Sequence, residues 1–319
     1  MKNGFFFIRK MHPRGLLGMA CFLLLATGLS GCGAAASSSP DLSSMKGTRD
    51  HTPSVLVPEA SGEKTLGTGD ALLDISHTED GYFCASYSGS SAKVKLQAVT
   101  SDGITYTYDL PVGGGMQVFP FSDGSGDYDI GIYTNVEETL YATEYQTTLS
   151  VSLSDEYLPF LYPNQYVWFT KDSAAVAKAA EITSPADTDL DAVTLVYDYV
   201  TSHVTYDWDK ARNVETGYLP DVDQTLAEGK GICFDYASLM AAMLRSQRIP
   251  TRLEIGYAGT AWHAWISTYI SDIGWVNGII RFDGTDWSLM DPTLAANEST
   301  KELKKYISDG SEYRTCYLY

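Results

Sequence analysis

Three side chains in the C-terminal half could together perform nucleophilic catalysis. Cys233 is followed by His263 after 30 residues and by Asp291 after a further 28. A thiol acts as a nucleophile when it is ionised near neutral pH, so its pKa must be lowered from about 8.5. A helix N-terminus and a neighbouring imidazole both favour the thiolate, and a carboxylate can orient that imidazole. The types and order of these residues are those that a Cys-His-Asp triad requires.

A helix is expected to carry Cys233 at its N-terminus. Over residues 233–247 apolar side chains recur at helical spacing, and Pro250 ends the pattern. Gly229 and Gly231 allow a sharp entry into this helix and leave room for a substrate backbone. Cys233 is therefore expected where unpaired amide groups and the helix dipole stabilise a thiolate.

His263 and Asp291 are expected at the ends of predicted strands. His263 opens its strand between Trp262 and Trp265, which would shield the imidazole from water. Asp291 follows a hairpin whose turn is the Asp283-Gly284 dipeptide, and its carboxylate could hold the second imidazole nitrogen. The predicted strands of this region cover residues 251–257, 263–270, 275–282 and 285–290.

An acyl-transfer site also needs hydrogen-bond donors for an oxyanion. The backbone amide of Cys233 is one candidate, and Tyr206 or Trp208, in a long connection predicted over residues 205–230, could supply another. Trp265 is a further candidate for substrate contact. Each residue also has an ordinary structural explanation, as a buried Cys, a packing aromatic or a turn Asp. The other histidines lack Cys, Asp or Glu at metal-ligand spacing, so neither a metal nor a cofactor is expected.

Residues 66–155 are predicted to form an antiparallel β-sandwich of the immunoglobulin-like type. Stretches rich in Val, Tyr, Thr and Ile alternate with Gly-rich turns, and no motif among them indicates chemistry. The strands are expected at residues 82–87, 93–100, 104–110, 115–121, 128–134 and 147–153. Residues 156–319 are predicted to form a second domain, with further helices over residues 174–181, 193–204 and 300–307. The predicted fold class of the chain is therefore α+β.

The N-terminus resembles a bacterial lipoprotein signal peptide. Four basic residues precede an apolar run that begins at Gly15, is short for a membrane span, and ends in Leu29-Ser30-Gly31-Cys32. The resemblance implies removal of residues 1–31 and attachment of lipid to Cys32, on the extracytoplasmic face of the cell membrane. Residues 32–65, rich in Ala, Ser, Gly, Thr and Pro, are expected to be a flexible tether. An ordinary signal peptide is the alternative.

Without residues 1–31 the chain is strongly acidic. It keeps 18 of its 22 basic side chains against 40 acidic ones, a formal net charge of −22. Nucleic acid and anionic lipid both reward clusters of Lys and Arg, so neither is an expected partner. Of the five cysteines, Cys21 leaves with the signal and Cys32 is assigned to lipid, and an odd remainder leaves at least one thiol free. A Cys84–Cys316 disulfide is open as an alternative to two further free thiols.

Several linked motifs resemble the transglutaminase-like superfamily. They are Tyr206-Asp207, Gly231-Ile232-Cys233-Phe234-Asp235-Tyr236-Ala237, Leu244-Arg245, Ile249-Pro250-Thr251-Arg252, Gly256-Tyr257, His263-Ala264-Trp265 and Asp291-Pro292-Thr293. The resemblance covers about residues 175–295. It implies a papain-like fold, and it maps the catalytic Cys, His and Asp of the superfamily onto Cys233, His263 and Asp291.

The implied chemistry is acyl transfer from an amide to the Cys233 thiolate, followed by attack of water or an amine on the thioester. For an extracellular protein without an evident amine pocket, we expect hydrolysis of a peptide or protein amide. Cell-wall peptide or a surface protein is the expected substrate. Protein cross-linking by transamidation is the main alternative. A non-catalytic module that binds peptide or glycan, and a thiol enzyme of another family, are the others.

Overall fold

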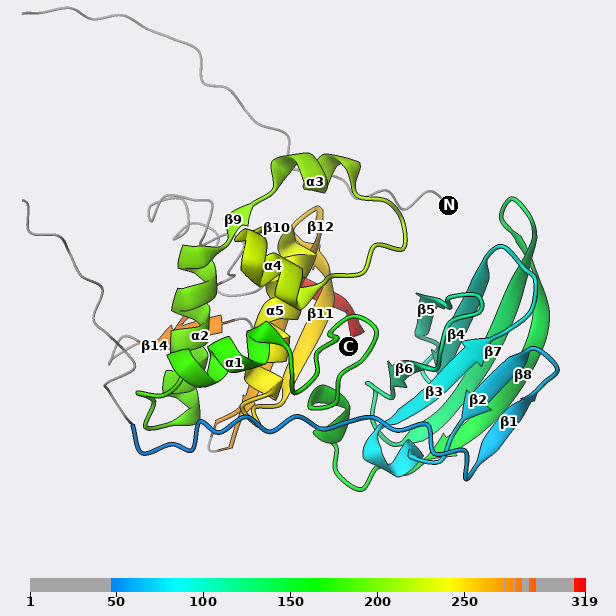
Figure 1. Ribbon diagram of the computed structural model, residues 1–319, viewed down its shortest axis with the longest axis horizontal. Coiled ribbons are helices and arrows are strands. Elements are labelled where there is room, and N and C mark those ends of the chain that lie inside the picture. Colours follow the sequence, from blue (N-terminus) through cyan, green and yellow to red (C-terminus); the bar gives the residue numbers. More distant parts are fainter. Residues whose placement is uncertain (1–46, 272, 278, 283–286, 291–312) are drawn as a thin grey trace, which may run out of the picture.

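The computed structural model describes residues 47–271, 273–277, 279–282, 287–290 and 313–319. Two antiparallel sheets form the N-terminal half, and the C-terminal half consists of helices packed on a third sheet (Figure 1). No helix in the described part of the chain is long and apolar enough to cross a lipid bilayer. The α+β fold class predicted from the sequence is confirmed.

The N-terminal strands form two four-stranded sheets. One has the order β1-β2-β3-β6 and the other β5-β4-β7-β8, with antiparallel neighbours throughout. The strands are β1 (Thr65–Thr68), β2 (Ala71–Asp74), β3 (Tyr82–Tyr87), β4 (Val94–Thr100), β5 (Thr105–Asp109), β6 (Gln117–Pro120), β7 (Gly126–Glu137) and β8 (Leu140–Val151). The six strands predicted from composition are all present. β1 and β2 were missed, because each is only four residues long and Gly67 and Gly69 interrupt the apolar pattern.

These two sheets share one hydrophobic core. In β4, Val94, Leu96 and Ala98 are buried and alternate with half-exposed residues, as expected for a strand with one face on a core. Tyr108 of β5 packs edge-on against Phe119 of β6 with ring centroids 4.8 Å apart, which joins the two sheets. This packing is that of a sandwich, and its immunoglobulin-like type stays a prediction.

The helices of the C-terminal half surround one buried helix. They are α1 (Ala174–Ile182), α2 (Asp189–His203), α3 (Trp208–Asn213), α4 (Val222–Glu228) and α5 (Cys233–Arg245). Thr188 and Asp191 form the capping box that begins α2. All 13 residues of α5 are buried, because α1, α2 and α4 and two strands of the third sheet pack around it. The expected helix at Cys233 is therefore the centre of this half.

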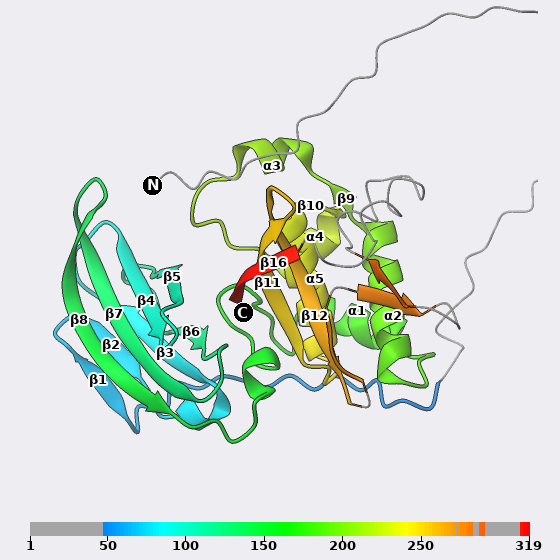
Figure 2. The same cartoon turned by 180° about the vertical axis from the view of Figure 1, so that it is seen from behind.

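The third sheet has the order β13-β12-β11-β16 and is antiparallel throughout. Its strands are β11 (Thr251–Ala258), β12 (Ala261–Ile270), β13 (Gly274–Asn277) and β16 (Tyr313–Leu318). β14 (Ile279–Phe282) pairs antiparallel with β15 (Trp287–Met290) in a separate two-stranded sheet. Figure 2 shows that β16 is the edge strand on the side of the N-terminal sheets.

Two expectations about this half were wrong. The single strand predicted over residues 275–282 is two strands in different sheets, β13 and β14. The Asn277-Gly278 dipeptide between them is a turn signal that lies inside an otherwise continuous apolar pattern. The connection predicted over residues 205–230 contains α3, α4 and two short parallel strands, β9 (Thr205–Tyr206) and β10 (Lys230–Gly231). The helix predicted over residues 300–307 lies outside the described residues.

The predicted tether covers residues 32–65, and the structure describes it from residue 47 onward, where it lies along the molecule. It runs from the helices to the N-terminal sheets (Figure 1). Arg49 forms an ion pair with Asp189 of α2 at 2.7 Å, and the Glu59 amide donates to the Tyr82 hydroxyl of β3 at 2.9 Å. Arg49 and the Glu59 amide thus have partners on both halves, and the flexibility of the tether over residues 32–65 stays a prediction.

Aromatic side chains join the N-terminal sheets to the third sheet. The ring of Tyr319, just after β16, lies 5.6 Å from that of Tyr106 and 5.8 Å from that of Tyr108, both of β5. Tyr319 is 4% exposed. The division of the chain into domains at residue 155 stays a prediction.

Candidate active site

Cys233 is the first residue of α5, and a short parallel strand pair fixes the chain just before it. Gly231 of β10 pairs with Tyr206 of β9, and Ile232 then serves as the N-cap residue in an extended conformation. A Cβ on Gly231 would lie 2.6 Å from the Cβ of Asp235, so only glycine allows this close approach. Cys233 is 6% exposed, so its thiol lies at a mostly covered helix N-terminus, where amide N–H groups point outward without helical acceptors.

Asp235 holds this turn from inside the protein. Its side chain is fully buried and accepts hydrogen bonds from the Ile232 amide at 2.7 Å and from the Tyr218 hydroxyl at 2.5 Å. Lys210 forms an ion pair with the same carboxylate at 2.8 Å. Burial, and then the adjacent Asp235 carboxylate, raise the pKa of Tyr218, so the phenol stays protonated and donates. The sequence analysis assigned no role to Asp235, although an acidic residue at the third helical position is a recognisable capping signal.

His263 lies on β12, near its first residue. It pairs with Gly256 of β11, and its ring stacks on that of Trp265 with centroids 6.2 Å apart and an interplanar angle of 26°. Trp265 is 3% exposed and packs edge-on against Tyr313 of β16, so the indole that stacks with the imidazole is itself fixed by packing. Its predicted contact with substrate stays a prediction.

The chain topology brings Cys233 and His263 to the same end of this half. α5 packs on β11 and β12. The chain leaves the C-terminal end of α5, returns along β11, and turns through a tight hairpin into the start of β12. The N-terminus of α5 and the start of β12 therefore lie together. Phe234 and Trp262, the neighbours of the two residues in sequence, line one cavity, which agrees with this placement.

Tyr206 and Trp208 flank the turn that carries Cys233. Tyr206 is on β9, directly beside β10, and Trp208 is the first residue of α3. The two rings pack edge-on with centroids 4.7 Å apart, and Trp208 is 48% exposed. Asp207 between them caps α3 and forms an ion pair with Lys230 at 3.0 Å. The pairing thus places an exposed indole next to the turn that carries Cys233, and the roles of both side chains as oxyanion donors stay predictions.

The remaining expected residues are placed as follows. Asp291 and Cys32 lie outside the described residues. Cys84 and Cys316 are both free thiols, so the disulfide left open by the sequence is not formed. Burial raises the pKa of Cys84 to about 12, which makes it inert near neutral pH.

Comparison with solved structures found proteins of low sequence identity, among them the following three. A proposed cysteine protease from Cytophaga hutchinsonii is 17% identical, with 72% of this chain and 73% of that chain covered and a TM-score of 0.35. The periplasmic domain of TgpA from Pseudomonas aeruginosa, bound to ethylmercury, is also 17% identical, with 76% and 78% covered and a TM-score of 0.32. Red sea bream transglutaminase is 12% identical, with 66% and 48% covered and a TM-score of 0.24.

Comparison with curated proteins gave no match. The family model of the transglutaminase-like superfamily matches residues 176–278. This range begins in α1 and contains both Cys233 and His263. Residues 176–278 of the chain therefore belong to the transglutaminase-like superfamily.

Proposed function

We propose that this protein is a thiol-dependent acyl-transfer enzyme that hydrolyses peptide or protein amides. The observation that carries the proposal is the position of Cys233 at the N-terminus of a wholly buried helix, within a domain of this superfamily. A helix N-terminus there stabilises a thiolate, and the start of β12 lies at the same end with His263.

In the proposed reaction the Cys233 thiolate attacks the amide carbonyl carbon. His263, as the imidazolium, donates a proton to the departing amine as the carbon–nitrogen bond breaks, which leaves a thioester on Cys233. Water loses a proton to His263 as it adds to the thioester, which releases a carboxylic acid and restores the thiolate and imidazolium. Asp291 is assigned the task of orienting the imidazole.

We also propose that the enzyme works at the outer face of the cell membrane, attached by lipid on Cys32. The support for this is the resemblance of the first 32 residues to a lipoprotein signal. Metabolic labelling with a fatty-acid analogue, compared between the native chain and Cys32→Ser, tests the attachment, and equal labelling of both would exclude it.

Thiol alkylation tests the nucleophile and has internal references. Iodoacetamide rates would be measured between pH 5 and 9 and assigned by peptide mapping to each thiol. Cys233 is expected to react faster at pH 6–7 than the partly exposed free thiol of Cys316, and to lose this advantage in His263→Ala. Cys84 should stay unreactive because burial raises its pKa to about 12. An alkylation rate at Cys233 no faster than that at Cys316 over the whole pH range would refute the assignment.

A second experiment separates hydrolysis from transamidation. The protein would be incubated with cell-wall peptides and surface proteins together with a tagged primary amine, and Cys233→Ala would serve as the inactive control. Hydrolysis predicts new carboxyl termini or released ammonia without tag. Incorporation of the tag would show that an amine resolves the thioester, and products that also form with Cys233→Ala would exclude Cys233 as the nucleophile.

A further inference from the structure

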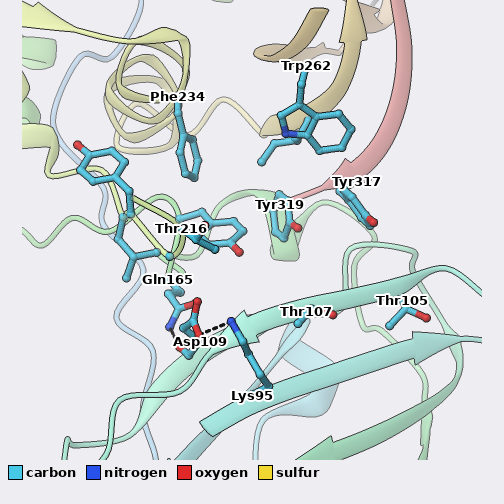
Figure 3. Close-up of a pocket in the computed structure, with 15 residues that line it drawn as sticks. Lys95, Thr105, Thr107, Asp109, Gln165, Thr216, Phe234, Trp262, Tyr317 and Tyr319 are labelled. Carbon is cyan, nitrogen blue, oxygen red and sulfur yellow. Dashed lines mark hydrogen bonds and ion pairs between the residues drawn. The ribbon is translucent and has the colours of Figure 1, made fainter. Parts of the chain in front are cut away.

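A cavity of about 310 Å³ lies between the N-terminal sheets and the third sheet, and neither Cys233 nor His263 lines it. Figure 3 shows that its two walls differ in chemistry. Aromatic rings from α5, β12 and the C-terminal segment form one wall, and polar side chains from β4 and β5 form the other. The cavity is near the lower end of the roughly 300–1,000 Å³ that small-molecule sites occupy.

The aromatic wall presents ring surface to the cavity. Trp262 and Tyr317 pack edge-on with centroids 6.2 Å apart, and both remain partly exposed. Phe234 and Tyr319 line the same wall but are almost completely buried, so they fix its shape. Such a surface suits a flat apolar face of a ligand.

The polar wall combines charged and neutral hydrogen-bonding groups. Lys95 and Asp109 form an ion pair on adjacent strands, and the exposed Thr107 lies beside them. Gln165 also lines the cavity, and its Nε2 donates to the Asp109 carbonyl at 2.8 Å. This wall can therefore both donate and accept.

One atom of this wall lacks a partner. Gln165 is 5% exposed, and its Oε1 is buried and accepts no hydrogen bond from any described residue. Native proteins rarely leave a buried acceptor unpaired, so Gln165 is the residue of this wall whose hydrogen bonding is incomplete.

We propose that this cavity binds a saccharide, with one pyranose ring lying on Trp262 and Tyr317. A pyranose has a face of C–H groups that packs on aromatic rings, and its edge carries hydroxyls that both donate and accept. Those hydroxyls match the mixed wall of Lys95, Asp109 and Gln165. An aromatic amino-acid side chain would use the first wall but offer at most one polar group to the second. This inference is independent of the proposed hydrolysis.

Ligand-observed NMR and calorimetry on the full chain test the proposal. The probes are the methyl glycosides of glucose, galactose, mannose and N-acetylglucosamine, the disaccharides cellobiose and chitobiose, and N-acetyltyrosinamide as the aromatic competitor. At least one sugar should bind with a Kd below about 5 mM, and N-acetyltyrosinamide should not displace it. No binding by any of these sugars, or binding of N-acetyltyrosinamide alone, would overturn the proposal.

Variants connect the binding to this cavity. Trp262→Ala should weaken the sugar affinity about ten-fold by removing the stacking surface, and Gln165→Leu several-fold by removing a polar group of the wall. Thr107→Val removes a hydroxyl from the polar wall. Because Thr107 is an exposed strand position, this variant should remain folded. Trp168→Ala is the matched control, because Trp168 is 48% exposed and does not line the cavity. Unchanged affinity in both Trp262→Ala and Thr107→Val, with melting temperatures like that of the native chain, would place the sugar elsewhere and refute the proposal.

Discussion

Replacement of Asp235 with Ala is expected to destabilise the transglutaminase-like domain by about 3 kcal/mol. The carboxylate is fully buried and joins three elements: the N-terminus of α5, the Tyr218 hydroxyl and Lys210 of α3. Its removal leaves each of these donors without its acceptor. The protein has no other described carboxylate hydrogen-bonded to the Ile232 amide.

The magnitude follows from the exposure of each donor. The Ile232 amide becomes a buried donor without an acceptor, which costs about 1–3 kcal/mol. Tyr218 loses a hydrogen bond to a charged group, about 1.5 kcal/mol, and recovers part of it from water because it is half-buried. Lys210 has a side chain 29% exposed and can turn to solvent, so its loss is small. The desolvation cost of the carboxylate is recovered, which keeps the total near the lower end of the range for a broken buried pair, about 3–5 kcal/mol.

Tryptophan fluorescence during thermal unfolding is a suitable assay, because all six tryptophans lie between residues 168 and 287. For a domain of this size, about 3 kcal/mol corresponds to a melting temperature lower by about 6–12 °C. Cys84, which is buried in β3, reports the N-terminal sheets through its protection from alkylation, and its midpoint should move less. Tyr218→Phe should show a smaller decrease, and the double variant should lose less than the two single variants together, because they share one hydrogen bond.

Asp209→Ala is the control for this experiment. Asp209 pairs with Arg212 on the surface, with a side chain 80% exposed, so its removal should change the free energy of unfolding by less than about 0.5 kcal/mol. If Asp235→Ala melts within 2 °C of Asp209→Ala, or if the effects of Asp235→Ala and Tyr218→Phe add fully, the structural role assigned to Asp235 is wrong.

Three other substitutions test different parts of the fold. Arg245→Met should destabilise the domain by about 3–5 kcal/mol in the same fluorescence assay. The Arg245 side chain is 1% exposed and donates to the carbonyls of Thr251, Tyr162 and Tyr319, which would lose their donors. Arg248→Met, at an exposed side chain, is the control, and equal melting temperatures of the two variants would contradict this prediction. Gly256→Ala should speed hydrogen exchange in β16, because the new Cβ would lie 2.1 Å from the Arg314 carbonyl oxygen. Gly115→Ala is the control, since a Cβ there meets open space, and equal exchange of β16 in the two variants would refute the β11–β16 pairing. Arg49→Ala should raise the rate at which subtilisin cleaves the segment before β1 several-fold above the rate in Arg212→Ala, because Arg49 bonds to Asp189 and Gln247. An equal cleavage rate in the two variants would show that other contacts hold the segment.

The helices and strands with strong periodicity could be predicted from the sequence. α5 and β11 are within two residues of their expected limits, since an apolar pattern bounded by Gly231 and Pro250 allows little freedom. β13 and β14 could not be separated, because both are short and apolar. The choice of different partner strands is made by tertiary pairing and not by local propensity.

The candidate site was only partly predictable. The Cys233 position followed from its motif and from the helix that begins there, and its neighbourhood with His263 followed from the expected order of elements. The network of Asp235, Tyr218 and Lys210 could not be predicted, because a side chain 17 residues before Asp235 meets it only through the path of α3 and α4. The contacts of residues 47–64 with both halves could not be predicted from the sequence either, because the composition of this segment is typical of linkers.

The region with the weakest sequence signal, residues 205–231, determines how rigidly Cys233 is held. Its two ends form β9 and β10 on one flank of the turn at Ile232, and its middle supplies Tyr218 and Lys210 to the buried carboxylate behind that turn. A helix N-terminus that is held from two sides loses little conformational entropy when a substrate binds. Under the proposed mechanism, the amide dipoles at this helix N-terminus act on the Cys233 thiol, so such preorganisation should raise its reactivity as well as the stability of the fold. Asp235→Ala should therefore lower the alkylation rate of Cys233 at pH 7 in the folded protein at 25 °C, and an unchanged rate would confine the role of this network to folding.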